Sequence, residues 1–440
     1  MWTYHPELLA RPVPRYTSYP TAADFQDIVG PDDMAAALDL VGADQAISLY
    51  VHIPYCREIC WYCGCNTGAA NRSARLSAYL TRLGEEIDRL AARLAGRGRV
   101  SRIAFGGGSP NAIAAAAFAS LTEYLRQRFR CEDAVLSVEI DPRGFDVEWA
   151  AAMADAGVSH ASLGVQTFDP AIQSAIGRVQ PPADIARAVG WLRRAGVTSL
   201  NFDLMYGLPG QDAAALRATL ATAIAMMPDR LAVFGYAHVP QVIPRQRRID
   251  ASALPGAAER FAQAALAHEV LTAEGYDAVG FDHFARPSDP LARAAAAGRL
   301  HRNFQGFVDD GASVVIGLGA SAISAFPDRL LQNEKNSGRY HMMLEQHGSA
   351  TARGCRLSAD DRVRGRAIAA ILCQGAADLA DIPDLSAVRA QLVPFEAAGL
   401  VRWAGTRLTL DSTALPYARS IAATLDAYRQ PGSARFSNAV

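Results

Sequence analysis

The chain has 440 residues, of which half are hydrophobic and a fifth are charged, a composition typical of a folded protein of two or three domains and unlike that of a disordered one. Its 43 basic and 44 acidic residues leave a net charge of −1, which argues against a protein that mainly binds nucleic acid or a membrane surface. Since no apolar run is long enough to span a bilayer and the first residues lack the apolar centre of a signal peptide, we expect a cytoplasmic protein.

Strands and helices are predicted to alternate through the first half of the chain. Residues 47–52, ISLYVH, form an apolar, β-rich run ahead of a cysteine-rich loop. Leucine and isoleucine then recur every three or four residues from Leu76 to Leu94, which predicts a one-sided helix. Further strands are predicted at residues 102–105, 135–140, 160–165, 199–204 and 231–236, with helices at about 112–129, 147–156 and 213–226 among them.

Six strands that alternate with helices predict parallel βα units wound into an open or closed barrel. In such folds the functional residues lie at the carboxyl ends of the strands. Polar or reactive positions follow the predicted strands here: the cysteine loop, the turn GGGSP, Glu139, Gln166, Asp203 and residues 237–238. We therefore expect one shared site at this end of the barrel.

The pattern changes from about residue 357 onward. Helices are predicted at 358–374 and 387–399, two short strands around Ala404 and Gly405, and a final helix at 413–428. This order resembles a winged helix, a nucleic-acid-binding arrangement, but no basic run accompanies it. We expect a small, mainly helical domain that caps the barrel.

Four of the seven cysteines lie within ten residues, as Cys56, Cys60, Cys63 and Cys65, whereas the other three are scattered. Structural zinc sites generally pair two short cysteine or histidine motifs, and no second motif is present. The usual ferredoxin motif has two residues between its first two cysteines, whereas three residues separate Cys56 from Cys60 here. The spacing C-x3-C-x2-C instead lets three thiolates hold a four-iron cluster with one iron open, as a reactive centre requires.

This motif after a strand resembles the signature of the radical S-adenosylmethionine (SAM) superfamily. The resemblance implies a (β/α)6 three-quarter barrel, with the winged-helix-like domain following it. It also implies a [4Fe-4S] cluster with Cys56, Cys60 and Cys63 as metal ligands. SAM would bind the open iron and be cleaved to a 5′-deoxyadenosyl radical.

Several longer segments narrow the resemblance. PRYTSYPT, VEIDPR, DHFARP, LHRNFQG and the terminal SARFSNAV resemble oxygen-independent coproporphyrinogen III dehydrogenases, a radical SAM family. The resemblance implies an oxidoreductase of porphyrin and heme biosynthesis that converts two propionates of coproporphyrinogen III to vinyl groups, giving protoporphyrinogen IX. Two alternatives remain open: a haem-binding chaperone and a haem-utilisation paralogue of the same family.

The family also implies partners and a division of the chain. Two SAM molecules, an electron donor such as flavodoxin with its reductase, and a monomer are expected, with neither nucleic acid nor membrane as a partner. The expected domains are an arm over the active site at residues 1–44, the radical SAM barrel and its extension at 45–345, and a helical cap at 346–440.

Site residues are carried over from the family motifs. Cys65 and Tyr50 are the expected catalytic residues. The expected cofactor-binding residues are Tyr50, Tyr62, Gly107, Gly108, Ser109, Glu139, Gln166, Arg178, Asp203, Ala237 and Ile323. Because the substrate carries four propionates, we also expect arginines around it, with Arg15, Arg286 and Arg302 as candidates.

Overall fold

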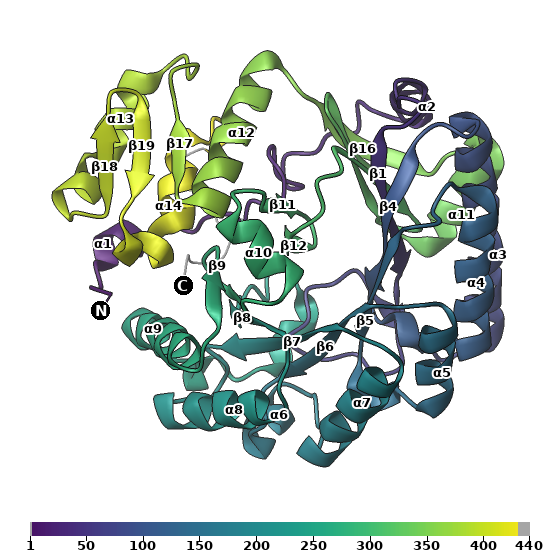
Figure 1. Cartoon of the computed structure of the whole chain (residues 1–440), viewed down its shortest axis with the longest axis horizontal. Helices are drawn as coiled ribbons and strands as arrows, with labels where there is room; N and C mark the ends of the chain where they lie inside the picture. Colours follow the sequence, from purple (N-terminus) through teal and green to yellow (C-terminus); the bar gives the residue numbers. More distant parts are fainter. Residues whose placement is uncertain (1, 430–440) are drawn as a thin grey trace.

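The computed structural model describes residues 2–429, and its centre is a twelve-stranded sheet that curls into an open barrel (Figure 1). Six strands run parallel in chain order as predicted. They are β1 (Ala46–Ile53), β4 (Arg99–Gly107), β5 (Val135–Ile140), β6 (His160–Gln166), β7 (Ser199–Tyr206) and β8 (Arg230–Gly235).

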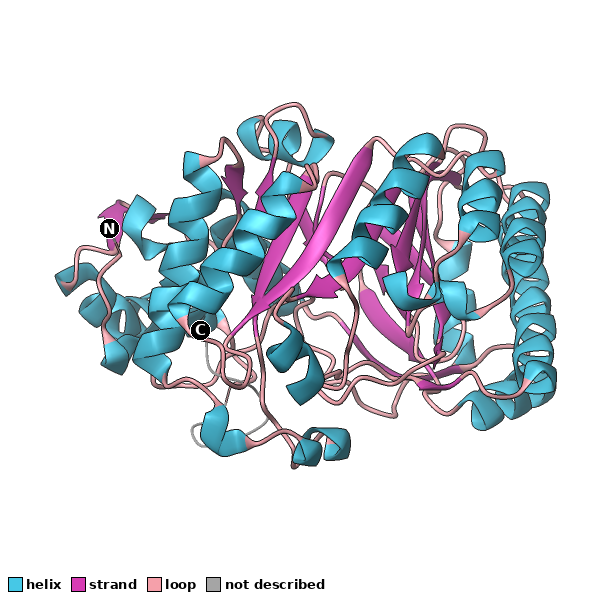
Figure 2. Cartoon of the chain, turned by 90° about the horizontal axis from the view of Figure 1, so that it is seen from below, coloured by secondary structure: helices cyan, strands magenta, loops and turns pink. Residues whose placement is uncertain are grey.

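Helices lie outside the strands and cover them, as Figure 2 shows from a second direction. They are α3 (Ser73–Leu94), α4 (Ala115–Arg128), α5 (Val147–Asp155), α6 (Pro170–Ala175), α7 (Pro182–Arg194), α8 (Ala213–Ala225) and α9 (Ala257–Ala273). The fold class is confirmed: apolar residues at alternate strand positions, such as Leu163 on β6 and Phe202 on β7, are fully buried against this helical layer.

Both edges of the sheet carry strands that the sequence did not indicate. At one edge β13 (Val314–Leu318) pairs in parallel with β1, and antiparallel strands β14 (Ile323–Phe326), β15 (Arg329–Asn333) and β16 (Thr351–Arg356) follow. At the other edge β10 (His283–Ala285) runs antiparallel to β8 and pairs with β9 (Asp277–Val279). The chain between these edges, from β10 to β13, contains α10 (Pro290–Ala296), β11 (His301–Asn303) and β12 (Gly306–Val308). The helix α11 (Ser337–His347) follows β15 and packs against α3 on the outside of the barrel.

The C-terminal unit contains α12 (Ala359–Gln374), α13 (Leu385–Ala397) and a small sheet of β17 (Ala376–Asp378), β19 (Arg407–Leu410) and β18 (Val401–Ala404). The prediction of one final helix at 413–428 is wrong. The described part of that segment is broken into η5 (Ser412–Tyr417), α14 (Ala418–Ala422) and η6 (Ala423–Leu425), because Pro416 lies within it and cannot donate a helical hydrogen bond. SARFSNAV lies outside the described residues.

The N-terminal arm belongs to two cores. Its first helix, α1 (Pro6–Leu9), packs with Val13 and Tyr16 against the C-terminal unit, and the two lie side by side in Figure 1. Its second helix, α2 (Pro31–Asp39), packs instead into the core of the barrel. Among residues 2–429 no helix has the length and apolarity that crossing a bilayer requires.

The expected domain boundaries remain a proposal, and the sheet suggests one refinement. The expected cap begins at residue 346, but β16 (Thr351–Arg356) pairs with β15 in the barrel sheet. A strand and its hydrogen-bonded neighbour belong to one folding unit. We therefore propose that the cap begins after Arg356.

A buried carboxylate fixes the turn between β13 and β14, which leads to the expected site residue Ile323. Glu86 on α3 accepts hydrogen bonds from the backbone N–H of Gly319 at 2.6 Å, from Asn333 at 2.7 Å and from the hydroxyl of Tyr340 at 2.7 Å. Burial raises the pKa of Glu86, and these three donors oppose the rise. The network thus ties the outer helix to the strand turn.

We predict that Tyr340→Phe lowers the free energy of unfolding by about 2 kcal/mol, because a buried carboxylate loses one of its donors. Chemical denaturation of the two proteins measures this difference. Tyr124→Phe is the matched control, since its hydroxyl donates to Asp88 at the surface and its loss should cost less than about 0.5 kcal/mol. Equal losses in the two variants would contradict the role given to Glu86.

Candidate active site

The cysteine loop leaves the carboxyl end of β1 and is closed at its base by two short strands. β2 (Tyr55–Cys56) pairs in parallel with β3 (Gly68–Ala69), so that Cys56 lies opposite Ala69. The loop between them carries the other three cysteines. It is therefore held at both ends on the rim of the barrel, as expected.

Each of the three sulfur atoms of the C-x3-C-x2-C motif has a hydrogen-bond donor. The hydroxyl of Thr67 donates to Cys56 Sγ at 3.1 Å, and the backbone N–H of Cys65 donates to Cys63 Sγ at 3.3 Å. The guanidinium groups of Arg143 and Arg178 both donate to Cys60 Sγ, each at 3.2 Å. Donors on every sulfur favour negatively charged thiolates, the form that binds metal.

The two arginines are themselves fixed by Asp141, which follows β5. Asp141 accepts from Arg143 at 2.7 Å and from Arg178 at 3.2 Å. Although burial opposes it, Arg178 and Arg143 hold the pKa of Asp141 below its ordinary value. Arg178 also donates twice to the carbonyl of Gly164, at 2.6 and 3.1 Å, so its side chain is held against the cysteine loop.

The donor set fits an iron–sulfur cluster and does not fit a single ion. Within residues 2–429 no three cysteine, histidine or carboxylate side chains converge as ligands of one metal ion. A zinc site would need its sulfurs gathered about 2.3 Å from one centre. Here Arg143, Arg178 and Thr67 donate hydrogen bonds to the sulfurs, which suits a larger, negatively charged group.

The thiols differ in their protonation. Hydrogen bonding from Cys65, opposed by burial, lowers the pKa of Cys63 to about 6. Burial raises the pKa of Cys56 to about 11. Metal binding therefore has to displace a proton from Cys56. Cys65 is exposed on the loop and contacts Cys63 through its backbone.

The glycine turn after β4 lets three functional groups approach the backbone. A Cβ at Gly106 would lie 2.7 Å from the carboxylate of Glu139, and one at Gly107 would lie 2.7 Å from the ring of His52. At Gly108 it would lie 2.5 Å from the Thr67 hydroxyl. Gly107 also has a φ of +116°, which favours glycine. Glycine is required at these three positions because side chains of the protein itself already occupy the space that a Cβ would fill.

Two carboxylates face the interior of the barrel from β5 and β7, the strands on either side of β6. Asp203 accepts from Ser162 at 2.9 Å and from Asn201 at 2.8 Å, whereas Glu139 receives one backbone N–H, from Gly107, at 3.3 Å. The loss of bulk water inside the barrel, together with the charge of Asp203, raises the pKa of Glu139 to about 7. Burial also raises the pKa of Asp203.

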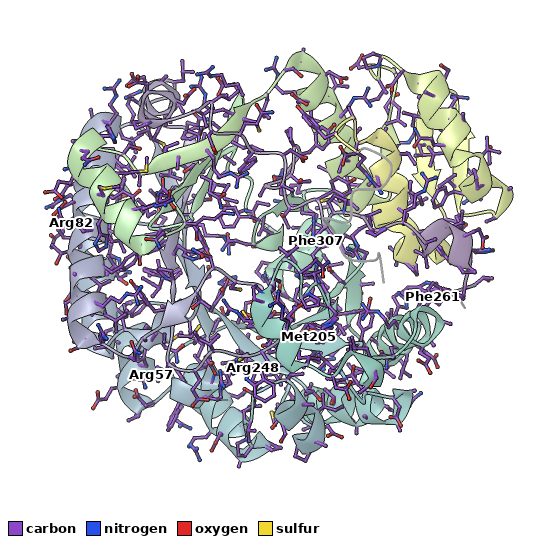
Figure 3. The ribbon with its side chains drawn as sticks, turned by 180° about the vertical axis from the view of Figure 1, so that it is seen from behind. Arg57, Arg82, Met205, Arg248, Phe261 and Phe307 are labelled. Carbon is purple, nitrogen blue, oxygen red and sulfur yellow. The ribbon has the colours of Figure 1, made fainter. Side chains whose placement is uncertain are left out.

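A cavity of about 270 Å³ lies beneath these carboxylates. Its wall includes His160, His283 and Phe307, the last of which is labelled near the centre of Figure 3. Arg102 and Arg230 also line the cavity, so carboxylates, arginines and aromatic rings share the interior of the barrel. Such a mixed lining can hold a ligand with charged and apolar parts.

The remaining expected cofactor residues line the same rim. The hydroxyl of Tyr50 lies 3.2 Å from His52 Nδ1, and its ring stacks edge-on against Phe304. Gln166 ends β6 with a φ of +68°, a strained conformation for a side chain with a Cβ. Three others are held through backbone or hydroxyl contacts: Tyr62 and Ala237 by Gln246, and Ser109 by Asn111.

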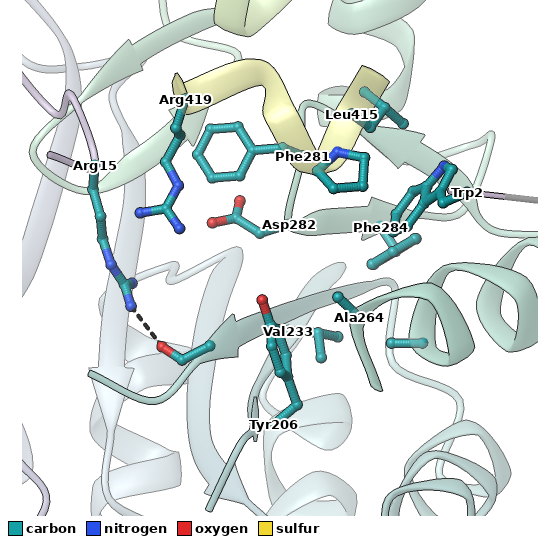
Figure 4. Close-up of a pocket in the computed structure, with 13 residues that line it drawn as sticks. Trp2, Arg15, Tyr206, Val233, Ala264, Phe281, Asp282, Phe284, Leu415 and Arg419 are labelled. Atoms are coloured by element: carbon teal, nitrogen blue, oxygen red, sulfur yellow. Dashed lines mark hydrogen bonds between the residues drawn. The ribbon is translucent and has the colours of Figure 1, made fainter. Parts of the chain in front are cut away.

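Two of the three expected substrate arginines lie together beside the site. Arg15 from the N-terminal arm donates to the carbonyl of Gly235 at 2.9 Å, at the end of β8. Arg302 donates to the carbonyl of Arg15 at 3.0 Å and lies between the rings of Phe281 and Phe307. Figure 4 shows Arg15 pointing into a pocket that also contains Asp282.

Arg286 lies elsewhere. It follows β10, whose end pairs with the first residue of β8, so it is at the amino end of the barrel strands. There its guanidinium stacks on Tyr276 at 3.9 Å and donates to the carbonyl of Glu274. The structure therefore does not bring Arg286 to the other two arginines.

Sequence reasoning assigned no role to three residues that shape the site. His52 is buried between Tyr50 and the hydroxyl of Ser321, which lies 3.2 Å from its Nε2, and burial lowers its pKa to about 4. Asp141 and Arg143 hold the cysteine loop. All three stand at or just after strand ends, and that position was the available signal.

Comparison with known proteins identifies relatives over the whole chain. Residues 50–223 match the radical SAM superfamily. The chain is 42% identical over 437 residues to a protein of Bradyrhizobium diazoefficiens named oxygen-independent coproporphyrinogen III oxidase, a match that covers 97% of each. A relative with the same name from Paracoccus denitrificans is 44% identical over 82% of this chain and 80% of its own length.

A solved structure also matches nearly the whole length of the chain. The radical SAM enzyme coproporphyrinogen III oxidase of Escherichia coli superposes with a TM-score of 0.91 at 33% sequence identity. The match covers 97% of this chain and 100% of that one.

We predict that Gly107→Ala destabilises the protein by about 3 kcal/mol. The added Cβ must displace the ring of His52, and the positive φ of Gly107 strains any residue that has a Cβ. Gly210→Ala is the matched control: its φ is +72° and nothing lies within 4 Å of the new Cβ, so only the backbone cost of about 1 kcal/mol remains. Thermal unfolding of both variants measures the difference. Equal destabilisation would show that His52 does not restrict this turn.

Proposed function

Because this chain belongs to the radical SAM family of oxygen-independent coproporphyrinogen III oxidases, we propose that it converts coproporphyrinogen III to protoporphyrinogen IX without oxygen. Two propionate side chains become vinyl groups, and each loses one hydrogen atom, one molecule of carbon dioxide and one electron, which passes to a one-electron acceptor. The observation that carries this proposal is the rim loop in which Cys56, Cys60 and Cys63 each have a hydrogen-bond donor. A haem-binding chaperone or haem-utilisation paralogue has less support, since the relatives compared share the oxidase name.

The superfamily uses a [4Fe-4S] cluster and SAM, and the cysteine loop fits such a cluster. We propose Cys56, Cys60 and Cys63 as its ligands. When bound, the cluster and SAM supply a carbon-centred radical that removes a hydrogen atom from the substrate. Arg143, Arg178 and Thr67 hold the sulfurs in place through the hydrogen bonds described above.

We propose that two SAM molecules bind along the rim. Glu139 and Asp203 are suited to the ammonium group and the ribose hydroxyls of SAM because carboxylates offer only acceptors. Tyr50 and Tyr62 offer aromatic surface, and Cys65 lies exposed on the loop next to Cys63. The other proposed SAM contacts are Gly107, Gly108, Ser109, Gln166, Arg178, Ala237 and Ile323.

Arg15 and Arg302 are the proposed contacts for substrate propionates. Both guanidinium groups are held by carbonyls and aromatic rings, and within residues 2–429 neither makes an ion pair with a carboxylate closer than 4.0 Å. A guanidinium oriented in this way can form a two-pronged bond with a carboxylate. For Arg286 the geometry offers no support.

The remaining proposals concern partners. The chain would act in the cytoplasm as a monomer, without nucleic acid or membrane. It would receive electrons from a carrier such as flavodoxin with its reductase. Turnover requires a reductant, since each propionate consumes one SAM molecule and the electron that cleaves it.

The deciding experiment is an anaerobic assay of the reconstituted full chain with SAM, dithionite and coproporphyrinogen III. We expect protoporphyrinogen IX, two carbon dioxide and two methionine per substrate molecule. Chromatography of the oxidised porphyrins and of methionine measures the products. Tight haem binding without any turnover would favour the chaperone instead.

A pair of cysteine variants tests the ligand assignment. We expect Cys60→Ala to lose the visible absorbance of the cluster, because a ligand and the anchor of two arginines are removed together. Cys65→Ser should keep the cluster and turn over poorly. Iron and sulfide analysis with absorbance spectra measures both. A full cluster in Cys60→Ala would overturn the assignment.

The raised pKa of Glu139 predicts how SAM binding depends on pH. The ionised carboxylate binds the cationic cofactor, so affinity should rise about tenfold from about pH 6 to about pH 8 as Glu139 loses its proton. Calorimetry of SAM binding measures this slope, which Glu139→Gln should abolish. Asp203→Asn should move the midpoint to lower pH, because the charge of Asp203 raises the pKa of Glu139. A flat profile in the unaltered protein would contradict the prediction.

A further inference from the structure

An exposed patch of arginine and apolar side chains surrounds the outer side of the cysteine loop. We call it the cluster-loop patch, and its members are Arg57, Trp61, Val179, Val242, Arg247 and Arg248. Val179 and Val242 are 60% and 62% exposed, which is unusual for large apolar side chains. Figure 3 labels Arg57 and Arg248 in the same lower region of the molecule.

Three separate segments form this patch because each packs directly on the cysteine loop. The backbone N–H of Trp61 donates to the carbonyl of Ile176 at 3.1 Å, and its ring covers Gly177, two residues before Val179. The short helix η3 (Pro244–Arg248) is bound to the loop by Gln246, which donates to the carbonyl of Tyr62 at 2.8 Å. Arg248 lies over the Trp61 ring at 5.8 Å.

The patch carries positive charge that the chain does not neutralise. Among the residues that the structure describes, Arg57, Arg247 and Arg248 make no ion pair within 4.0 Å. Of the acidic side chains in the same segments, Glu58 pairs with Arg143 at 2.9 Å, whereas Asp250 accepts from the neutral N–H of Ser252 at 2.9 Å and keeps its charge. For a chain of net charge −1, three unpaired arginines at one place are a local excess.

We propose that the cluster-loop patch is the docking surface for an acidic one-electron carrier protein. The inference rests on the proposed function, because electron transfer at this surface requires a reducible group bound by the cysteine loop. The carrier loses one electron and the cluster gains it, and no bond forms or breaks. Trp61 of the patch belongs to the same loop as Cys60 and Cys63, so a carrier seated here approaches the cluster through the thickness of one loop.

The composition of the patch suits a transient partner. Redox complexes have small interfaces and dissociate quickly. An aromatic and aliphatic centre with an arginine rim supplies a small contact area, and the positive charge accelerates encounter with an acidic surface. Such attraction weakens as salt screens it. A nucleic acid would also be attracted by three arginines, and the experiment below separates it.

The test compares two double variants of the reconstituted full chain. Arg247→Glu with Arg248→Glu reverses the charge of the patch, whereas Arg402→Glu with Arg407→Glu makes the same change on the exposed C-terminal hairpin. The probe is oxidised flavodoxin, an acidic flavoprotein, titrated by calorimetry at low and at high salt. We expect the patch variant to bind about tenfold more weakly at low salt and the hairpin variant within about twofold of the original.

A second measurement separates docking from catalysis. The patch variant should be reduced more slowly by reduced flavodoxin, yet turn over normally when dithionite replaces it. Arg247→Lys with Arg248→Lys should restore binding, because charge and not guanidinium shape attracts the carrier.

Three results would overturn the docking surface. They are unchanged flavodoxin binding in the patch variant, equal loss of turnover with dithionite, or tighter and salt-sensitive binding of a single-stranded oligonucleotide to the patch. If the original protein bound flavodoxin as expected but gave no product with dithionite, the proposed function would fail and the docking surface would stand.

Discussion

The site depends on supplying three cysteine sulfurs at the mouth of a barrel with positive and polar partners. A charged sulfur in a half-buried loop is costly unless donors surround it. Arg143 and Arg178 meet this need at Cys60, and Asp141 holds both arginines so that they do not repel one another. The cysteine loop, the end of β5 and the segment after α6 are thereby joined into one rigid edge.

The parallel barrel makes the rest of the site possible. Because every strand delivers its carboxyl end to one rim, side chains far apart in sequence, such as His52, Glu139 and Asp203, come together without long loops. The close approach of these side chains at the rim has two consequences. Two carboxylates share one interior, which raises the pKa of Glu139, and the backbone of Gly106 and Gly107 must pass closer to side chains than a Cβ would allow.

The outer parts of the chain complete this rim. The N-terminal arm threads between the barrel and the C-terminal unit, and Arg15 reaches the end of β8 from it. On the opposite side of the cysteine loop the cluster-loop patch faces outward. In our two proposals, the porphyrinogen binds beside Arg15 and Arg302, and the electron carrier docks on the cluster-loop patch.

The sequence alone determined the barrel and the position of its reactive end. Hydrophobic periodicity located the six strands β1 and β4 to β8, and the spacing of Cys56, Cys60 and Cys63 indicated a cluster with an open iron, because both signals are local. Only the tertiary structure decided what depends on distant pairing: the edge strands β13 to β16, the broken helix at Pro416, and the separation of Arg286 from Arg15 and Arg302. The roles of His52, Asp141 and Arg143 also became visible only in the tertiary structure. Their partners are distant in sequence, so no periodic pattern around these residues indicates the contacts.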